Sequence, residues 1–340
     1  MAEAQQIDTV YFGNPVFDIT CEDSERVLMN KYSLELGMAS LATPEQMAIY
    51  PEMWAREDKN TTPGGSALNS CRAQKHANPA GSTAYFGCIG NDDQGRALVD
   101  SVTTAGIDGK FEVSEQDPTS LCAVVVVGRE RTLCAHIAAA RKYSLAHMTA
   151  NMDVLERAKF LYTTGFFIDS NTEAVDKLCQ FASENNKPLG FNVSALFVIQ
   201  FYMEAVKRTI KHADYVFCNE DEGSAFAQAE GLEASDRVGV AKLLASYEKV
   251  NQERPRVVII TQGKEPTIVA TGVPGQEARV DLVEVAPIDQ SLIIDTNGAG
   301  DSFVGGFFAS LSKGEDLLAA VAKGNELAGK VIQRSGCVFD

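Results

Sequence analysis

Short apolar runs alternate with amphipathic segments over most of this chain. The apolar runs predict buried strands, and the segments with a period near 3.6 residues predict helices. The expected strands cover residues 9–12, 82–89, 160–163, 189–193, 215–218 and 257–261, and expected helices include 66–76, 94–105, 173–185 and 236–250. This β-then-α succession is typical of an α/β fold with a parallel sheet covered by helices on both faces. Ligands bind such sheets at the carboxyl ends of the strands.

Two segments interrupt this pattern. Residues 17–43 and 120–135 carry alternating, β-branched positions, and Gly128-Arg129-Glu130 is expected to turn between two strands, 122–127 and 132–137. Neither segment fits between βα units, so we expect a small separate sheet that covers the active site as a lid and excludes water. The expected bounds are 1–16, 62–118 and 138–340 for the large domain and 17–61 and 119–137 for the lid.

The charge balance narrows the possible partners. The 340 residues include 30 Lys and Arg against 46 Asp and Glu, a formal charge of -16, and we find no basic cluster. Neutralising nucleic-acid phosphates requires the opposite balance, so we expect neither nucleic acid nor an anionic membrane as a partner. An acidic protein that binds an anion must use backbone N–H groups, a few placed cations or a metal.

Cysteine and histidine usage points to a reducing compartment. The eight cysteines are scattered, with no Cys-x-x-Cys pair, and the four histidines lack metal-ligand spacing. The cysteines are therefore expected to be small buried side chains rather than disulfides or zinc ligands. The first residues lack a charged segment followed by an apolar core, and no run reaches about 18 apolar residues. We expect a cytoplasmic protein.

The most informative motif is the run Asp295-Thr296-Asn297-Gly298-Ala299-Gly300-Asp301. It lies between an apolar, strand-like segment at 291–294 and an amphipathic segment at 302–311. A glycine-rich turn that enters a helix presents unpaired backbone N–H groups to an anion, and glycine keeps bulky side chains off a bound phosphate. Asp301 beside such a site suits a base that takes a proton from a hydroxyl attacking a phosphoryl group. The alternative is that Asp301 only caps the helix.

Three further motifs place polar groups near strand ends. Gly64-Gly65-Ser66-Ala67-Leu68-Asn69 can offer a backbone N–H and an amide to neighbouring hydroxyls, or can simply begin a helix. Asp18, which follows Gly13-Asn14-Pro15, can accept hydrogen bonds from two vicinal hydroxyls or cap a turn. Asn219-Glu220-Asp221-Glu222 offers oxygens to Mg²⁺, or forms an acidic helix N-terminus.

In this order, and with Thr261-Gln262-Gly263 after a strand, these motifs resemble the ribokinase-like (pfkB) kinases of sugars and nucleosides. Within the family the chain is most similar to the members that phosphorylate adenosine, on features such as Gly165-Phe166-Phe167 and the ending Gly336-Cys337-Val338-Phe339. The resemblance runs from about residue 10 to 339. It implies a three-layer α/β/α fold with a central, mostly parallel sheet and a small β-rich lid domain.

The resemblance also implies an activity, the ATP-dependent phosphorylation of the adenosine 5′-hydroxyl to AMP and ADP. It implies Asp301 as base, an anion hole from Gly298, Ala299 and Gly300, and Arg131 on the transferring phosphate. It places Asp18, Gly65 and Asn69 on the ribose, and around the nucleoside Asn14, Ser66, Leu133, Ala135, Phe167 and Phe197. Thr261, Gly263 and Asn297 would line the ATP side, and Asn219 with Glu222 would organise Mg²⁺.

Three departures from the family pattern bear on base preference rather than on the chemistry. Val16-Phe17 replaces Leu-Leu before Asp18, Leu196 replaces a proline, and Arg141 replaces an asparagine. The implied partners are adenosine and ATP, and the implied assembly is a monomer. Two alternatives stay open: a ribose or fructose kinase of the same fold, and a catalytically silent nucleoside-binding relative.

Overall fold

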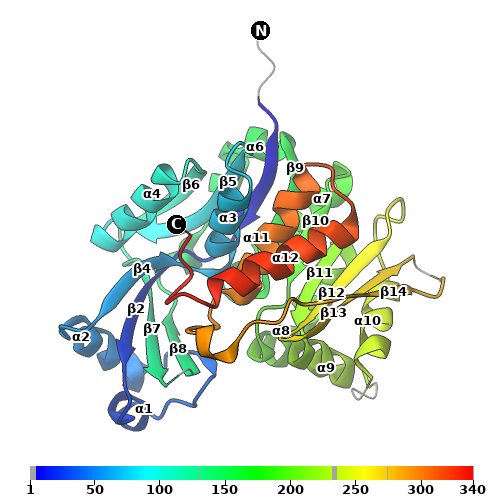
Figure 1. Ribbon diagram of the computed structural model, residues 1–340. Helices are drawn as coiled ribbons and strands as arrows, with labels where there is room; N and C mark the ends of the chain where they lie inside the picture. The colour runs from blue at the N-terminus through cyan, green and yellow to red at the C-terminus, as the bar shows by residue number, and fades with distance from the viewer. Residues whose placement is uncertain (1–4, 129, 232–235, 274, 340) are drawn as a thin grey trace.

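A computed structural model describes residues 5–128, 130–231, 236–273 and 275–339. Nine strands form the central sheet (Figure 1). In spatial order they are β14 (Arg279–Val283), β13 (Glu265–Gly272), β12 (Arg256–Gln262), β11 (Tyr215–Asn219), β10 (Leu189–Asn192), β9 (Ala158–Thr164), β1 (Ile7–Phe12), β5 (Thr83–Gly90) and β6 (Asp108–Ser114). From β12 to β6 all neighbours are parallel, whereas β13 and β14 add an antiparallel edge.

Helices cover both faces of this sheet, as the sequence predicts. One face packs against α3 (Ser66–Ala77), α4 (Asp93–Thr104), α11 (Ala299–Ser312) and α12 (Leu317–Val331). The other packs against α5 (Leu145–Ala150), α6 (Met152–Glu156), α7 (Gly165–Glu184), α8 (Leu196–His212), α9 (Glu220–Ala229) and α10 (Arg237–Ser246). Residues of β1 and β5 are buried along their whole length. Burial on both faces explains why these strands are mostly apolar without the alternation of a half-exposed strand, although the polar Asp8, Thr9 and Thr83 are also buried.

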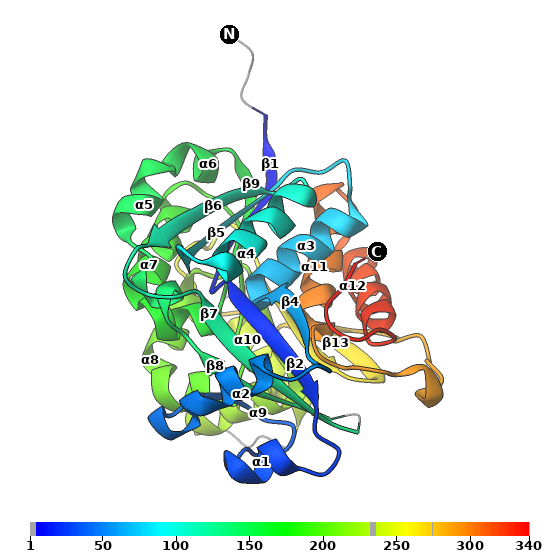
Figure 2. The same cartoon turned by 90° about the vertical axis from the view of Figure 1, so that its left-hand side faces the viewer.

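A second sheet of five strands lies at the carboxyl ends of the first (Figure 2). Its order is β3 (Ala39–Leu41), β8 (Glu130–His136), β7 (Ser120–Val127), β2 (Val16–Glu22) and β4 (Asn60–Gly64). The short helices α1 (Val27–Lys31) and α2 (Ile49–Trp54) pack on its outer face around Ile19 and Val125. The predicted hairpin of β7 and β8 is present, although Arg129 of its turn lies outside the described residues.

Two expectations about elements need correction. The apolar residues 291–294 form no strand: a 3-10 turn covers Gln290–Leu292, and Leu292 and Ile294 are 53% and 54% exposed. The helix expected over 236–250 ends earlier, at Ser246. No described helix is both long and apolar enough to cross a membrane.

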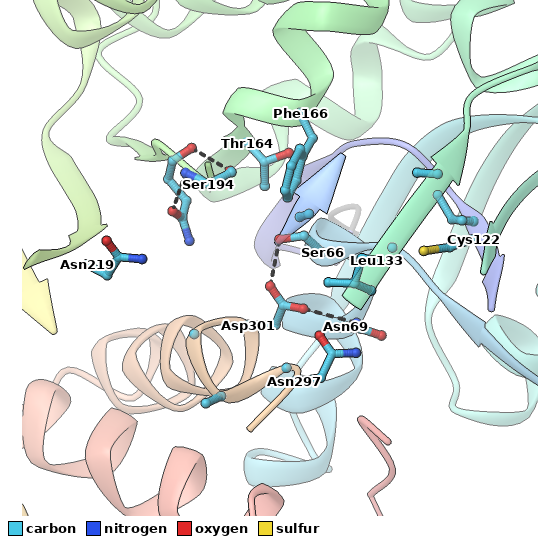
Figure 3. A pocket seen from close by; sticks show the side chains of 18 of the residues that line it. Ser66, Asn69, Cys122, Leu133, Thr164, Phe166, Ser194, Asn219, Asn297 and Asp301 are labelled. Atoms are coloured by element: carbon cyan, nitrogen blue, oxygen red, sulfur yellow. Dashed lines mark hydrogen bonds between the residues drawn. The ribbon is translucent and has the colours of Figure 1, made fainter. Parts of the chain in front are cut away.

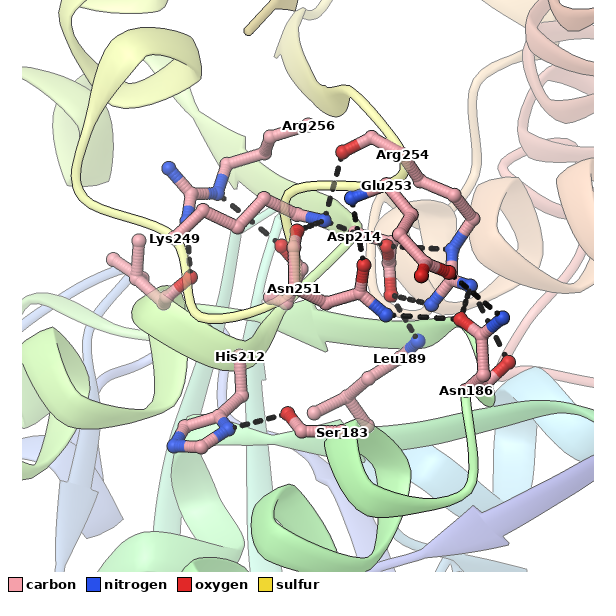
Figure 4. A network of polar contacts seen from close by, with 12 residues as sticks. Ser183, Asn186, Leu189, His212, Asp214, Lys249, Asn251, Glu253, Arg254 and Arg256 are labelled. Carbon is pink, nitrogen blue, oxygen red and sulfur yellow. Dashed lines mark hydrogen bonds and ion pairs between the residues drawn. The ribbon is translucent and has the colours of Figure 1, made fainter. Parts of the chain in front are cut away.

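A buried polar network fixes the amino ends of β10, β11 and β12 (Figure 4). These ends lie opposite the carboxyl ends that face the five-stranded sheet, which is called the lid sheet below. Asp214 accepts hydrogen bonds from Lys249 Nζ at 2.9 Å and from the backbone N–H of Leu189 at 2.9 Å. The fully buried Arg256 donates to five backbone carbonyls, including those of Ala213 and Ile210. The buried cations of Lys249 and Arg256 are therefore paired or hydrogen-bonded. This network stabilises the end of the sheet opposite the carboxyl ends of the strands.

Candidate active site

A cavity of about 500 Å³ lies between the two sheets, at the carboxyl ends of the central strands. Its walls come from the ends of β9, β10, β11 and β12, from the amino ends of α3 and α11, and from the inner face of the lid sheet. Val16, Cys122 and Leu133 are among the lid residues that face it. The position agrees with the rule that ligands bind parallel sheets at this end.

Asp301 lies in the first turn of α11 and points across the cavity toward α3 (Figure 3). Its Oδ1 accepts a hydrogen bond from Ser66 Oγ at 2.6 Å, and its Oδ2 accepts one from Asn69 Nδ2 at 3.0 Å. Burial raises the pKa of Asp301 to about 6, although these two hydrogen bonds act in the opposite direction. The capping alternative therefore does not describe this residue, because its oxygens bond to another helix rather than to amides of α11.

The two glycines of the loop before Asp301 have different roles. Gly298 has φ +76, and a Cβ at this position would lie 2.8 Å from the Cβ and the Sγ of Cys337. Gly300 has no atom within 4 Å of the position of a Cβ, so open space lies there. Ala299 N bonds to Thr296 O and Ser302 N to Gly298 O, which leaves the amides of Gly300 and Asp301 as first-turn donors without a backbone partner among the described residues. Gly298 thus shapes the loop, whereas Gly300 keeps the space in front of these amides open.

Asp295 fixes the start of this loop through hydrogen bonds from backbone amides. It is 1% exposed, and it accepts hydrogen bonds from Asn297 N at 2.9 Å and from Gly336 N at 2.6 Å. Arg131 of lid strand β8 forms an ion pair with it, with 2.5 Å between Nε and Oδ1. Arg131 also donates to Ser335 Oγ at 3.2 Å. The buried carboxylate of Asp295 therefore connects three parts of the protein: residues 295–300, called the anion loop below, the C-terminal segment and the lid sheet.

The predicted ribose residues meet on one wall of the cavity. Asp18, Gly65 and Asn69 all line it, together with Asn14 and Ser66. Gly65 has φ +106, and a Cβ there would lie 2.2 Å from Asn14 O, so only glycine fits between α3 and this strand end. Burial and the nearby charge of Asp301 raise the pKa of Asp18 to about 7. Asn14 Nδ2 donates to Phe166 O at 2.9 Å, which links this wall to the aromatic end.

Two phenylalanines form the other end of the cavity, and one of them is not the predicted residue. Phe166 and Phe197 both line the cavity, with ring centroids 5.9 Å apart. Phe167 is wrong as a wall residue: it is fully buried in the core, 5.6 Å from the ring of Tyr143. Leu133 and Ala135 line the cavity as predicted.

Sequence reasoning also missed other residues of this wall. Ser194 lines it with φ +78, a backbone conformation that a non-glycine residue rarely adopts. Asp169 lines it as well, and its carboxylate accepts hydrogen bonds from Arg141 at 2.8 Å and from Tyr202 at 2.5 Å. The cation that departs from the family pattern is thus paired with a carboxylate of the cavity wall. No motif marks Asp169, and the signal for Phe166 is only its neighbour Phe167.

Asn219 and Glu222 are placed together at the cavity by a capping box at the start of α9. Asn219 N and Nδ2 donate to the two oxygens of Glu222 at 3.1 and 3.0 Å, and Glu222 N donates to Asn219 Oδ1 at 2.8 Å. Burial raises the pKa of Glu222 to about 7, so a cation beside it would favour its ionised form. In the described part of the chain no group of three or more His, Cys, Asp or Glu could hold a metal. The pair therefore fits a Mg²⁺ whose other ligands are phosphate oxygens and water.

Of the three residues predicted on the ATP side, two line the cavity. Thr261 at the end of β12 and Asn297 of the anion loop both line the cavity. Gly263 does not: it has φ +59 in the turn between β12 and β13, and no atom lies within 4 Å of a Cβ placed there. The positive φ of this turn explains the glycine at position 263, which the sequence assigns to a binding motif.

Comparisons with known proteins agree with this geometry. The model of the pfkB family of carbohydrate kinases matches residues 42–340. Adenosine kinase 2 of Arabidopsis thaliana is 34% identical over 344 residues, covering 100% of this chain and 98% of that protein. The adenosine kinase of Schizosaccharomyces pombe is 38% identical over 333 residues, covering 96% of this chain and 95% of that protein.

Among solved structures, Anopheles gambiae adenosine kinase in complex with P1,P4-di(adenosine-5) tetraphosphate superposes with a TM-score of 0.93. It is 33% identical in sequence, and the match covers 99% of this chain and 98% of that one. The expected ribokinase-like α/β fold is therefore confirmed. By its sequence, its fold and the position of its anion loop, the chain belongs to the pfkB family of carbohydrate kinases.

Proposed function

We propose that this protein is a nucleoside kinase that transfers the γ-phosphoryl group of ATP to the 5′-hydroxyl of adenosine, giving AMP and ADP. The observation that carries the proposal is the position of Asp301. Its carboxylate lines a cavity with an aromatic end, stands beside the free amides of Gly300 and Asp301, and is held by hydrogen bonds from Ser66 and Asn69. Similarity to adenosine kinases over the whole chain supports the choice of substrate.

The nucleoside is oriented by the two ends of the cavity. Asp18 accepts hydrogen bonds from the ribose hydroxyls, with Gly65 and Asn69 beside it, and the purine lies near Phe166 and Phe197. This orientation directs the 5′-hydroxyl toward Asp301. A free sugar would leave the aromatic end unfilled, so the Phe166–Phe197 pair favours a nucleoside over ribose or fructose.

In the reaction, the 5′-oxygen attacks the γ-phosphorus while Asp301 takes its proton, and ADP leaves with the electron pair of the broken P–O bond. The free amides of Gly300 and Asp301 stabilise the charge on the transferring group, whereas the amide of Ala299, expected in this role, is bonded to Thr296 O. Arg131 reaches this group from the lid, and Thr261 and Asn297 line the path of the remaining phosphates. Asn219 and Glu222 would hold the Mg²⁺ of the nucleotide, which neutralises phosphate charge when bound.

Several broader assignments belong to the same proposal. The five-stranded sheet, built from residues of about 17–61 and 119–137, acts as a lid. It closes on adenosine and excludes water from the phosphoryl group. The protein acts as a monomer, in the cytoplasm. All eight cysteines are unpaired, which supports a reducing compartment.

A comparison of substrates tests this function. We expect kcat/KM with ATP to be highest for adenosine, lower for inosine, and at least about 100-fold lower for ribose, because ribose cannot fill the aromatic end. ADP formation in a coupled assay measures all three. A preference for ribose would refute the nucleoside assignment, and adenosine binding without any ADP formation would indicate a silent relative.

A further inference from the structure

Asp169 introduces a negative charge into the aromatic end of the cavity, where the proposed reaction has no use for one. It lies three residues after Phe166 on α7, so the two side chains occupy one face of the helix, a turn apart. Its side chain is 2% exposed, and it lines the same cavity as Phe166 and Phe197. A buried carboxylate on an apolar wall is costly unless it is paired and hydrogen-bonded.

The partners of Asp169 leave part of its accepting capacity unused. Oδ1 accepts from Tyr202 Oη at 2.5 Å, and Oδ2 accepts from Arg141 at 2.8 Å. A carboxylate offers about four acceptor sites, so about two remain after these bonds. Tyr202 and Arg141 come from α8 and from the turn after the lid sheet, and neither lines the cavity. They therefore hold the carboxylate in place from behind while its remaining acceptor sites are available to a ligand.

We infer that Asp169 is a specificity-determining residue that accepts a hydrogen bond from an amino group on the base, and that the site selects 6-aminopurine nucleosides. The inference rests on the proposed function, because a nucleoside with its 5′-hydroxyl at Asp301 and its ribose at Asp18 places its base beside Phe166. The amino group is the only N–H donor of adenine in a nucleoside. A base that lacks it leaves a buried carboxylate with unused acceptor sites, which is the arrangement that discriminates strongly.

Purine riboside, which is adenosine without the amino group, is the direct probe. The amino group of adenosine would donate to a charged carboxylate, and such hydrogen bonds are stronger than neutral ones. We therefore expect kcat/KM for adenosine to exceed that for purine riboside by about 10–100-fold in the unaltered protein. In Asp169→Leu the ratio should fall to about 1, mainly through loss on adenosine, and in Asp169→Asn it should fall part of the way. Asp176→Leu is the matched control, since Asp176 is on the same helix, pairs with Arg208 at 3.2 Å and does not line the cavity.

The outcomes separate this inference from the function beneath it. A ratio near 1 in the unaltered protein, or an unchanged ratio in an active Asp169 variant, would overturn the role of Asp169 and leave adenosine phosphorylation standing. Failure of the unaltered protein to phosphorylate either nucleoside would instead reject the proposed function. If Asp169→Leu does not fold, the ratio in the unaltered protein and in Asp169→Asn still decides the question.

Discussion

Three carboxylates with raised pKa values face one cavity in this protein. Burial is the main cause for each: the pKa of Asp301 lies at about 6, and those of Asp18 and Glu222 lie at about 7. Such groups cluster where chemistry requires them rather than where stability favours them. Their neighbours differ, since Asp301 lies in the first turn of α11 and bonds to Ser66 and Asn69, whereas Glu222 bonds to Asn219 at the start of α9. We therefore expect them to differ in role.

The pKa values predict an acidic limb in the rate. Asp301 must be ionised to take a proton, and Asp18 must be ionised to accept from both ribose hydroxyls. As pH falls, Asp18 protonates near pH 7 and Asp301 near pH 6. A plot of log kcat/KM for adenosine against pH should therefore fall with a slope that steepens from one toward two. Asp18→Asn should remove the limb near 7 and keep the one near 6. A flat profile between pH 5 and 8 would contradict both assignments.

Which of these residues can be read from the sequence depends on their neighbours. Asp301, Ser66 and Asn69 stand beside glycine turns at helix starts, and the structure brings all three together. Phe166 and Phe167 are adjacent and identical in type, so only the rotation of α7 about its axis decides which one enters the cavity. Asp169 has no local signal, because its role comes from tertiary neighbours on α8 and after the lid.

At the scale of elements, the turn into α11 is the part on which the account depends. The positive φ of Gly298 and its contact with Cys337 fix the loop, whereas Gly300 leaves space in front of the amides. Glycine is thus needed at position 298 for the positive φ of the loop, and at position 300 to keep the space beside the backbone open.

Two alanine substitutions should separate these roles. Gly298→Ala forces a Cβ into a positive-φ position 2.8 Å from Cys337, so it should lower both Tm and activity. Gly300→Ala meets nothing within 4 Å, so Tm should hardly change, but its methyl group occupies the phosphate space and should lower kcat/KM for ATP by about 10–1,000-fold. Thermal melts and steady-state kinetics on the two variants give the comparison. Full activity in Gly300→Ala would show that no phosphate approaches this amide.

Six strands of the central sheet, β1, β5 and β9 to β12, were predicted to within a few residues. Their middle positions are buried and mostly apolar in sequence. Three strands toward the two sides of the sheet were not predicted: β13 and β14, whose antiparallel hairpin breaks the βα alternation, and β6, the parallel strand at the other edge, which is only partly buried. Residues 291–294 show the opposite error: they are apolar, but they lie exposed in the segment that leads to the anion loop.

At the scale of the whole molecule, Arg131 joins the lid to the body. Its ion pair with Asp295 and its bond to Ser335 connect β8 to the anion loop and the C-terminal segment. Asp295 is nearly inaccessible, so a move of Arg131 toward a phosphate requires this pair to rearrange as the lid closes. The fold of the lid could be predicted from the alternating pattern of β2 and β7, but its contact with the body depends on residues about 160 positions apart along the chain.

Hydrogen exchange measures whether the lid closes on adenosine. Saturating adenosine should increase protection in residues 17–43 and 120–135 and around Gly64 and Gly65, because closure orders the lid and its connection to α3. The network around Asp214 lies at the other end of the sheet and should show unchanged exchange. Equal exchange in the lid with and without adenosine would mean that the site is preformed and that Gly64 and Gly65 do not act as a hinge.

The central claim is that Asp301 is the base for phosphoryl transfer to adenosine. Asp301→Asn keeps the shape of the side chain but cannot take a proton; its amide oxygen can still accept from Asn69 Nδ2, and its amide N–H can donate to Ser66 Oγ. The direct measurement is AMP formation at saturating adenosine and ATP, with adenosine affinity determined by titration on the same samples. We predict that kcat falls by about 10²–10⁴ while the Kd for adenosine changes less than about tenfold. Turnover within a few-fold of the unaltered protein would contradict the account.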